Sequence, residues 1–405
     1  MNPDAFSEMA VTHKRVFLRV DFNVPIEDGQ VLDDRRIALS CDAIRSLADR
    51  GGRVILASHR GRLKTAGFDP AFSLAPCAAR LREMLGKDVR LLDDCVGDRV
   101  REAILQMTDG DVVLLENLRF HSGEKKNDVG FAQQLAELAD VYCHEAFGAA
   151  HNTDASLIQV PQLIRQKGGA CLAGPLLVRE LAEISRFRQP LRRPFVAVMG
   201  GSKVDTKLPA VQHLLKLADF VLVGGSMTYG FMQAQEKRIG QSLCGEKDLA
   251  AATAILAATR DSLGQLRLPA DHYCAEELRR GISRTVPSSE ITGNLMGLDI
   301  GPRTARESVE IIRQAGTVFW NGPMGALEYP PFDAGTRLVA EAVTEATRRG
   351  AYTFIGGGES AMAVQQSGLL AEITHVSTGG GASLHYISGQ DFESVKLLDY
   401  QKSSQ

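Results

Sequence analysis

Short runs of β-branched and other apolar residues alternate along this 405-residue chain with longer stretches that have the apolar spacing of a helix. This alternation is typical of a parallel sheet whose strands are connected by helices, so it predicts an α/β fold. The expected strands are 16–20, 54–57, 112–115, 195–199, 220–223, 317–320 and 352–355. The clearest expected helices are 73–84, 131–138, 204–217 and 333–348. In such sheets ligands bind beyond the carboxyl ends of the strands, so the residues that follow each run are the informative ones.

Polar and basic residues follow the expected strands in the first half of the chain. Arginine presents a planar fork of donors that matches two carboxylate or phosphate oxygens at once. A single arginine is more often part of a surface salt bridge, but three of them beside one sheet favour an anion site. The residues expected to surround a small anionic substrate are Arg36, Arg62 and Arg119, with Asp21, Asn23 and His59.

Glycines follow the expected strands in the second half. Glycine clusters at strand-to-helix turns let backbone N–H groups approach phosphate oxygens, and the helix N-terminus adds its positive dipole. One cluster is weak evidence, because tight turns also need glycine, but five in one half favour a nucleotide site. They lie at 200–201, 224–225, 322–325, 356–358 and 379–381. The GxxxxGK[ST] motif and the HRD and DFG motifs are missing from the sequence, which excludes a P-loop NTPase and a protein kinase.

Four charged residues next to these glycines are further candidates. Lys203 and Lys207 lie four residues apart on one expected helix face, where they would either bind phosphate or face solvent. Glu359 follows the glycines at 356–358 and is the best Mg²⁺ ligand, although a carboxylate there also suits the helix dipole. Glu328 is either a ribose acceptor or an ordinary loop carboxylate.

The contrast between an arginine half and a glycine half indicates two domains. The helical pattern at 175–185 and the basic, proline-containing stretch at 186–194 mark the expected boundary.

The formal net charge of −3 gives no reason to expect nucleic acid or membrane as a partner. Seven scattered cysteines without a CxxC pair indicate reduced thiols in a cytoplasmic protein. Residues 1–14 lack the pattern of a signal peptide, and no apolar run is long enough to span a bilayer.

The segment RVDFNVP at 19–25 resembles the signature of the phosphoglycerate kinase family. The resemblance continues in the family's order and spacing through 58–62, 115–121, 200–207, 320–325, 356–360 and 377–383. It implies two Rossmann-like domains with parallel sheets joined by a hinge helix. The expected limits are 1–173, 174–187 for the helix, and 188–388, with the tail 389–405 returning to the first domain.

The resemblance also implies an activity: reversible phosphoryl transfer between 1,3-bisphosphoglycerate and ADP, which gives 3-phosphoglycerate and ATP. The enzyme is expected to be a cytoplasmic monomer that uses Mg²⁺ and closes at its hinge. The implied phosphoglycerate residues are Asp21, Asn23, Arg36, His59, Arg62, Arg119, His151 and Asn152. The implied nucleotide residues are Lys203, Lys207, Gly225, Asn321, Glu328, Gly357, Gly358, Glu359 and Ser360, with Glu359 as the metal ligand. The residues expected to act on the transferring phosphoryl group are Arg36, Lys203, Lys207 and Gly380.

Two places depart from the family pattern. Where the family reads NDAFGTAHR, this chain has His144 and Glu145 in place of Asn-Asp, and Asn152 in place of the arginine. Where the family reads GGGD, the acid is Glu359. These changes leave two hypotheses open: an active kinase, and a catalytically impaired paralogue that binds nucleotide or has a regulatory role.

Overall fold

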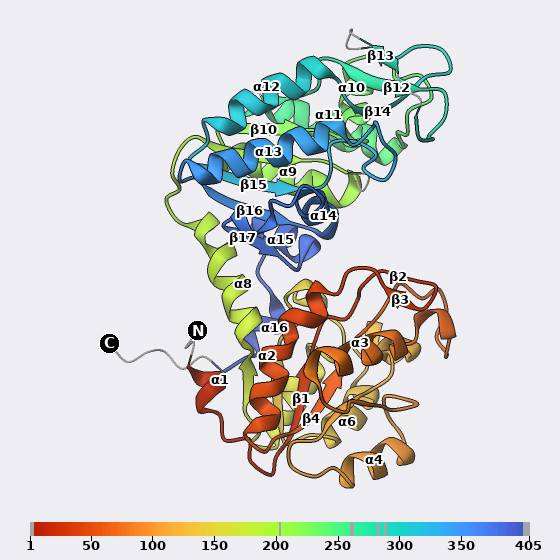
Figure 1. Ribbon diagram of the computed structural model, residues 1–405, viewed down its shortest axis with the longest axis vertical. Helices are drawn as coiled ribbons and strands as arrows, with labels where there is room; N and C mark the ends of the chain where they lie inside the picture. The colour runs from red at the N-terminus through yellow and green to blue at the C-terminus, as the bar shows by residue number, and fades with distance from the viewer. Residues whose placement is uncertain (1–3, 202–203, 260–262, 282–283, 287–289, 400–405) are drawn as a thin grey trace. The chain divides into compact units, whose positions relative to one another are not determined.

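The computed structural model describes residues 4–201, 204–259, 263–281, 284–286 and 290–399. These residues form two compact units: 4–182 together with 391–399, and 183–390. Helix α8, Pro175–Ser185, contains the point at which the chain passes from the first unit to the second (Figure 1). The domain limits and the hinge role expected from the sequence stay a prediction.

The first unit is built on a parallel sheet. Its strands lie in the order β5 (Arg90–Leu91), β6 (Val112–Leu114), β4 (Arg53–Ala57), β1 (Arg15–Arg19), β7 (Val141–His144) and β8 (Cys171–Ala173). Because all of these strands run the same way, the loops that follow β1, β4, β6 and β7 meet at one edge.

Helices cover this sheet. Side chains of α2 (Arg35–Asp49) and α3 (Ala75–Leu85), such as Ile44 and Leu81, form one core with Leu18 and Leu56 of the sheet. Successive strand residues face opposite sides, so Phe17 and Tyr142 stack with ring centroids 5.8 Å apart on the other face. There α6 (Val129–Glu137) packs on α7 (Gln159–Gln166), which contacts β7 and β8. Shorter elements are α1 (Ala5–Glu8), α4 (Asp98–Leu105), α5 (Ser122–Lys125), β2 (Ile26–Glu27) and β3 (Gln30–Val31).

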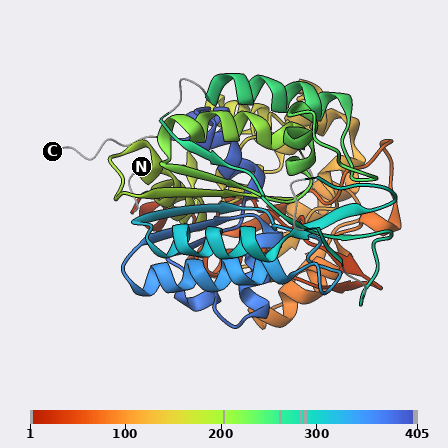
Figure 2. The same ribbon diagram turned by 90° about the horizontal axis from the view of Figure 1, so that it is seen from above.

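The second unit repeats this plan. Its parallel sheet has the order β11 (Gln265–Arg267), β10 (Phe220–Val223), β9 (Phe195–Met199), β15 (Thr317–Asn321), β16 (Tyr352–Gly356) and β17 (His375–Ser377). Helices α12 (Pro302–Arg313) and α13 (Ala334–Arg348) cover one face, and α9 (Val204–Leu217) and α11 (Glu246–Ala258) cover the other (Figure 2). The remaining helices are α10 (Met227–Ala234), α14 (Gly358–Gln366) and α15 (Gly380–Ile387). A small antiparallel sheet has the order β13 (Arg284–Val286), β12 (His272–Ala275) and β14 (Met296–Ile300).

The C-terminal segment belongs to the first unit. In α16 (Glu393–Lys396), the hydroxyl of Ser394 donates to the carbonyl of Ala150 at 2.8 Å. The carboxylate of Asp399 accepts from the backbone N–H of Cys171 at 2.8 Å and pairs with Arg165 at 2.5 Å. These contacts hold 391–399 against the loop after β7 and the edge strand β8.

The parallel α/β architecture expected from the sequence is confirmed. The seven expected strands correspond to β1, β4, β6, β9, β10, β15 and β16, and the four clearest helices to α3, α6, α9 and α13. Within the two parallel sheets, the sequence pattern missed the short strands β5, β7, β8, β11 and β17. Strand β7 reads Val-Tyr-Cys-His, and all four residues are buried, so neither alternation nor a long apolar run marked it.

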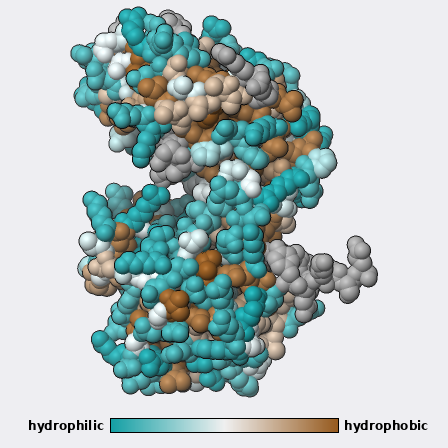
Figure 3. Space-filling view, turned by 180° about the vertical axis from the view of Figure 1, so that it is seen from behind, coloured by the Kyte–Doolittle hydropathy of each residue, from teal (hydrophilic) through white to brown (hydrophobic). Residues whose placement is uncertain are grey.

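In the face drawn in Figure 3, hydrophilic residues predominate and hydrophobic residues are scattered among them. Within the described part of the chain, no helix combines the length and the apolar character needed to cross a membrane.

Phe187 is predicted to be a main support of the second unit. Its ring is buried and lies 5.6 Å from the ring of Phe195 and 5.5 Å from those of Phe319 and Phe354. Phe187→Ala should lower the unfolding free energy by about 3–5 kcal/mol, because it removes these contacts and leaves a cavity. Trp320, the one tryptophan of the chain, is buried in this unit, so its fluorescence in a denaturant titration reports the change.

The matched control is Phe68→Ala, because the Phe68 side chain is exposed and belongs to the first unit. That variant should unfold with a tryptophan transition close to the parent's. Equal transitions for both variants would contradict the role given to Phe187.

Candidate active site

Arg36 lies at the carboxyl edge of the first sheet. It is in the first turn of α2, and its Nη1 lies 3.1 Å from Oδ2 of Asp21 and donates to the carbonyl of Asn23 at 2.8 Å. Asp21 and Asn23 belong to the loop after β1. The guanidinium is therefore held beside the end of the central strand.

Arg119 belongs to the same cluster. Its Nη1 donates to the carbonyl of Gly61 at 2.6 Å, and the N–H of Gly61 donates to the side-chain oxygen of Asn23 at 2.9 Å. Asn117 accepts from the backbone N–H of Arg119 at 3.1 Å. The loops after β1, β4 and β6 are thus joined by hydrogen bonds, which brings Asp21, Asn23, Arg36 and Arg119 to one edge.

The other substrate candidates are placed less tightly. Arg62 follows Gly61 and is exposed, while His151 and Asn152 are half-buried in the loop after β7. Two residues further on, the buried carboxylate of Asp154 lies 2.8 Å from Nζ of Lys125 and 3.5 Å from Nη2 of Arg119. Sequence reasoning missed Asp154 and Lys125, because nothing in the local pattern distinguished them from surface charges.

His59 differs from the arginines in its burial and its charge. Its side chain is almost fully buried, and Nδ1 lies 2.9 Å from Nη2 of Arg19. Burial, together with the positive charge of Arg19, holds the pKa of His59 well below its usual range. His59 is therefore an uncharged residue of this edge rather than one of its cations.

The glycine loops of the second unit pack backbone against backbone. The N–H of Gly200 donates to the carbonyl of Asn321 at 3.0 Å, that of Gly201 to Pro323 at 2.7 Å, and that of Gly225 to Met324 at 2.9 Å. A Cβ atom on Gly200 would lie 2.0 Å from the carbonyl oxygen of Pro323. Glycine is needed here for close loop packing, which accounts for part of the pattern read as a phosphate cradle.

Asn321 connects three of these loops. Its Nδ2 donates to the carbonyl of Gly356 at 2.6 Å and to that of Gly380 at 3.4 Å. The next N–H, that of Gly322, donates to the hydroxyl of Ser360 at 2.6 Å. The starts of α14 and α15 are therefore held at the carboxyl end of β15, where Gly357 is half-buried and Gly358 is exposed.

Lys207 and Glu359 converge on the first of these loops. The buried ammonium group of Lys207 donates to the carbonyl of Gly200. A Cβ on Gly201 would lie 2.7 Å from Nζ of Lys207 and 3.8 Å from Oε2 of Glu359, so both charged groups border this glycine. Glu359 is exposed, as is Glu328 on the loop after β15. The candidate Lys203 lies outside the described residues.

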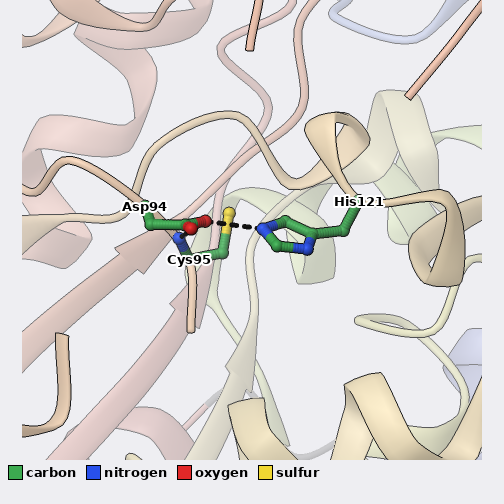
Figure 4. A group of neighbouring side chains, drawn as sticks. All are labelled: Asp94, Cys95 and His121. Carbon is green, nitrogen blue, oxygen red and sulfur yellow. Dashed lines mark hydrogen bonds and ion pairs between the residues drawn. The ribbon is translucent and has the colours of Figure 1, made fainter. Parts of the chain in front are cut away.

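A different group in the first unit has the composition of a metal site. Among the described residues, the ligand atoms of Asp94, Cys95 and His121 lie within 4.8 Å of one another (Figure 4). Nε2 of His121 lies 2.5 Å from Oδ1 of Asp94, and the thiol of Cys95 donates to the carbonyl of Glu116 at 2.9 Å. Burial raises the pKa of this thiol well above its usual range. The three side chains are satisfied by these hydrogen bonds, so we describe them as a structural group.

Similar known proteins identify the family of this chain. The family model for phosphoglycerate kinase matches residues 6–390. The chain belongs to the phosphoglycerate kinase family. It is 42% identical over 403 residues to the phosphoglycerate kinase of Rhodopirellula baltica, covering 98% of this chain and 100% of the relative. It is 45% identical over 389 residues to that of Anaeromyxobacter dehalogenans, covering 95% and 96%.

Solved structures of phosphoglycerate kinases share its fold. The Coxiella burnetii enzyme matches with a TM-score of 0.78 and 35% identity, covering 96% of this chain and 97% of that one. The Pyrococcus horikoshii enzyme matches with a TM-score of 0.83 and 28% identity, covering 97% of each chain.

Against the phosphoglycerate kinase pattern, His144 and Glu145 take structural positions in this chain. The carboxylate of Glu145 accepts from the backbone N–H groups of Leu176 at 3.1 Å and Leu177 at 3.4 Å, in the first turn of α8. His144 accepts from the N–H of Ala146 at 3.2 Å, and burial lowers its pKa to about 3. The replacement at 144–145 therefore serves the start of α8 and the local backbone.

Glu145 is predicted to make stability depend on pH. Burial raises its pKa to about 8 from an ordinary value of 4.5, so the folded protein keeps a proton that the unfolded chain releases. Stability should therefore fall as pH rises from 4.5 to 8. Glu145→Gln removes this dependence, so the parent should lose about 1–2 kcal/mol relative to the variant between about pH 5.5 and about pH 7.5. Hydrogen exchange of first-unit amides measures the difference.

Glu137→Gln is the control, because Glu137 is the exposed last residue of α6, and its backbone carbonyl, which the substitution keeps, accepts from Nη1 of Arg15. A pH slope that is the same in the parent and in Glu145→Gln would contradict the assignment.

Proposed function

We propose that the chain catalyses the reversible transfer of a phosphoryl group between 1,3-bisphosphoglycerate and ADP, giving 3-phosphoglycerate and ATP. The observation that carries this proposal is the cluster of Arg36 and Arg119 with Asp21 and Asn23 at the carboxyl edge of the first sheet, in a chain of this family. Such a cluster suits a small substrate with several negative charges.

In this proposal the first unit binds phosphoglycerate. Arg36 and Arg119 offer paired donors to carboxylate or phosphate oxygens, and their contacts with Asp21 and Gly61 hold the guanidinium groups in position. Asn23 links the loops, and His59 adds an uncharged donor. Arg62, His151 and Asn152 complete the proposed set from the neighbouring loops.

The second unit binds the nucleotide in this proposal. The N-termini of α14 and α15, at Gly358 and Gly380, provide backbone N–H groups and a positive dipole for phosphate oxygens. Lys207 adds a positive charge beside Gly200 and Gly201, and Lys203 is proposed to act with it. Gly225, Asn321, Glu328, Gly357 and Ser360 are proposed as the remaining nucleotide residues.

Glu359 fits a Mg²⁺ ion. Its carboxylate is exposed and lies near Lys207 at the first glycine loop, and Mg²⁺ typically takes one or two carboxylates, phosphate oxygens and water. When bound, the ion would neutralise charge on the nucleotide phosphates. The chain's own residues hold the phosphates, orient the acceptor and exclude water. No general base is required, because the acceptor is already a carboxylate or a phosphate oxygen.

We further propose that the enzyme is a cytoplasmic monomer. All seven cysteines are free thiols in the described residues, and six of them are buried, which suits a reducing compartment.

A coupled assay of turnover with ATP and 3-phosphoglycerate tests the function, and Arg36→Lys tests the site. Lysine keeps the charge but loses the planar guanidinium, whose Nη1 contacts Asp21 and Asn23, so kcat/KM should fall at least about tenfold. The control is Arg35→Lys, because the neighbouring Arg35 pairs with Asp33 at 2.5 Å instead. The control should keep nearly full activity. Absence of turnover in the parent would support the impaired paralogue, and full activity of Arg36→Lys would remove Arg36 from the site.

Asn152 is predicted to weaken substrate binding, because it replaces the family's arginine with an uncharged side chain. A regained charge-assisted contact is worth about 1.5–3 kcal/mol, so Asn152→Arg should lower the KM for 3-phosphoglycerate by about one to two decades. The KM for ATP should hardly change. Asn152→Gln, which adds length without charge, is the matched control. No change in KM, or a loss of activity, would mean that the loop around Asp154 no longer accepts an arginine.

A further inference from the structure

Arg19 is a fully buried arginine at the end of β1, and each edge of its guanidinium has a partner within the first unit. Its Nε donates to the hydroxyl of Ser156 at 2.8 Å, and its Nη1 donates to the carbonyl of Val20 at 2.5 Å. Its Nη2 lies 2.9 Å from Nδ1 of His59. Arg19 therefore touches a candidate substrate residue while lying below the surface itself.

The contact with Arg19 decides which nitrogen of His59 carries the proton. A guanidinium has only N–H donors and no acceptor, so Nδ1 of His59 must be the acceptor in this hydrogen bond. A neutral imidazole has one N–H, and that N–H is then on Nε2. A second proton on Nδ1 would break the bond and place two positive charges side by side in a buried position.

Buried partners prevent Arg19 from turning away. The hydroxyl of Ser156 accepts from Arg19 and donates to Oε1 of Glu124 at 2.7 Å, and the N–H of Ser156 donates to Oε2 at 3.0 Å. Glu124 is fully buried, and its carboxylate lies 4.0 Å from Nη2 of Arg19, so it balances the arginine's charge. Ser156 and Glu124 lie in loop and short-helix segments far from β1 in the sequence, and their contacts with Nε and Nη2 help to fix the guanidinium that reaches His59.

We infer that Arg19 is a positioning residue, which locks His59 as the Nε2–H tautomer so that His59 offers a neutral donor to an oxygen of the anionic substrate. This inference rests on the proposed function for the substrate, but the tautomer itself does not. The Nε2–H group would select between substrates by the atom that lies opposite it. An oxygen atom there accepts its hydrogen bond, whereas an N–H group there would leave two donors facing each other.

The first test is the nitrogen-15 NMR spectrum of His59 in the ligand-free full-length chain labelled at histidine, assigned with His59→Gln. The expected spectrum at neutral pH has a protonated Nε2 and an unprotonated Nδ1. A protonated Nδ1, alone or together with Nε2, overturns the inference without any variant. The spectrum does not depend on turnover, so it tests the tautomer of His59 separately from the proposed function.

The second test uses Arg19→Met, with Arg15→Met on the same strand as the matched control, because Arg15 pairs with Asp140 at 2.6 Å away from His59. Arg19→Met should give a mixture of His59 tautomers and raise the KM for 3-phosphoglycerate about tenfold or more, with the KM for ATP nearly unchanged. The control should keep the parent's tautomer and KM. If Arg19→Met fails to fold, Ser156→Ala replaces it and should shift both readouts in the same direction. Unchanged tautomer and KM in the folded variant would show that Arg19 has only a structural role.

Discussion

The parallel direction of the strands is the constraint on which both candidate sites depend. In the first unit β1 pairs with β4 and β7 in parallel, so the loops that follow these strands are neighbours although they are far apart in the sequence. In the second unit β15 has the same relation to β9 and β16. The loops then determine which groups lie at each edge: arginine side chains in the first unit, and glycine turns with Lys207 in the second.

The two edges are stiffened in different ways. Side chains join the loops of the first unit, as when Asn23 accepts from Gly61 and Arg119 donates to the same glycine. In the second unit the loops approach so closely that a side chain on Gly200 or Gly380 would collide with neighbouring backbone, and Asn321 supplies the polar links. Both arrangements hold donors in fixed positions, which the proposed stabilisation of developing charge requires.

Much of this could be predicted from the sequence, because long β-branched runs mark central strands and the residues after them are visible in the chain. What could not be predicted depends on burial. Arg19 reads as a charged end of a strand, yet it is fully buried and contacts His59, which changes His59 from an expected partner of the cations to a neutral donor. The sequence also did not indicate that Asp154 and Lys125 belong to this cluster, because only the fold brings them to Arg119. Likewise, the change at Glu145 concerns the start of α8, a partner about thirty residues away.

We propose that an anionic phosphoglycerate binds the edge of the first sheet and that the nucleotide binds the edge of the second. Hydrogen–deuterium exchange on the full-length chain, with 3-phosphoglycerate alone and with Mg²⁺ and ADP alone, tests it most directly. We expect 3-phosphoglycerate to protect amides in the loops at 20–24, 58–62 and 117–121, and the nucleotide to protect those at 322–325, 356–360 and 379–381. Protection of the second unit's loops by 3-phosphoglycerate alone, or of the first unit's loops by the nucleotide alone, would contradict the assignment of the two sites.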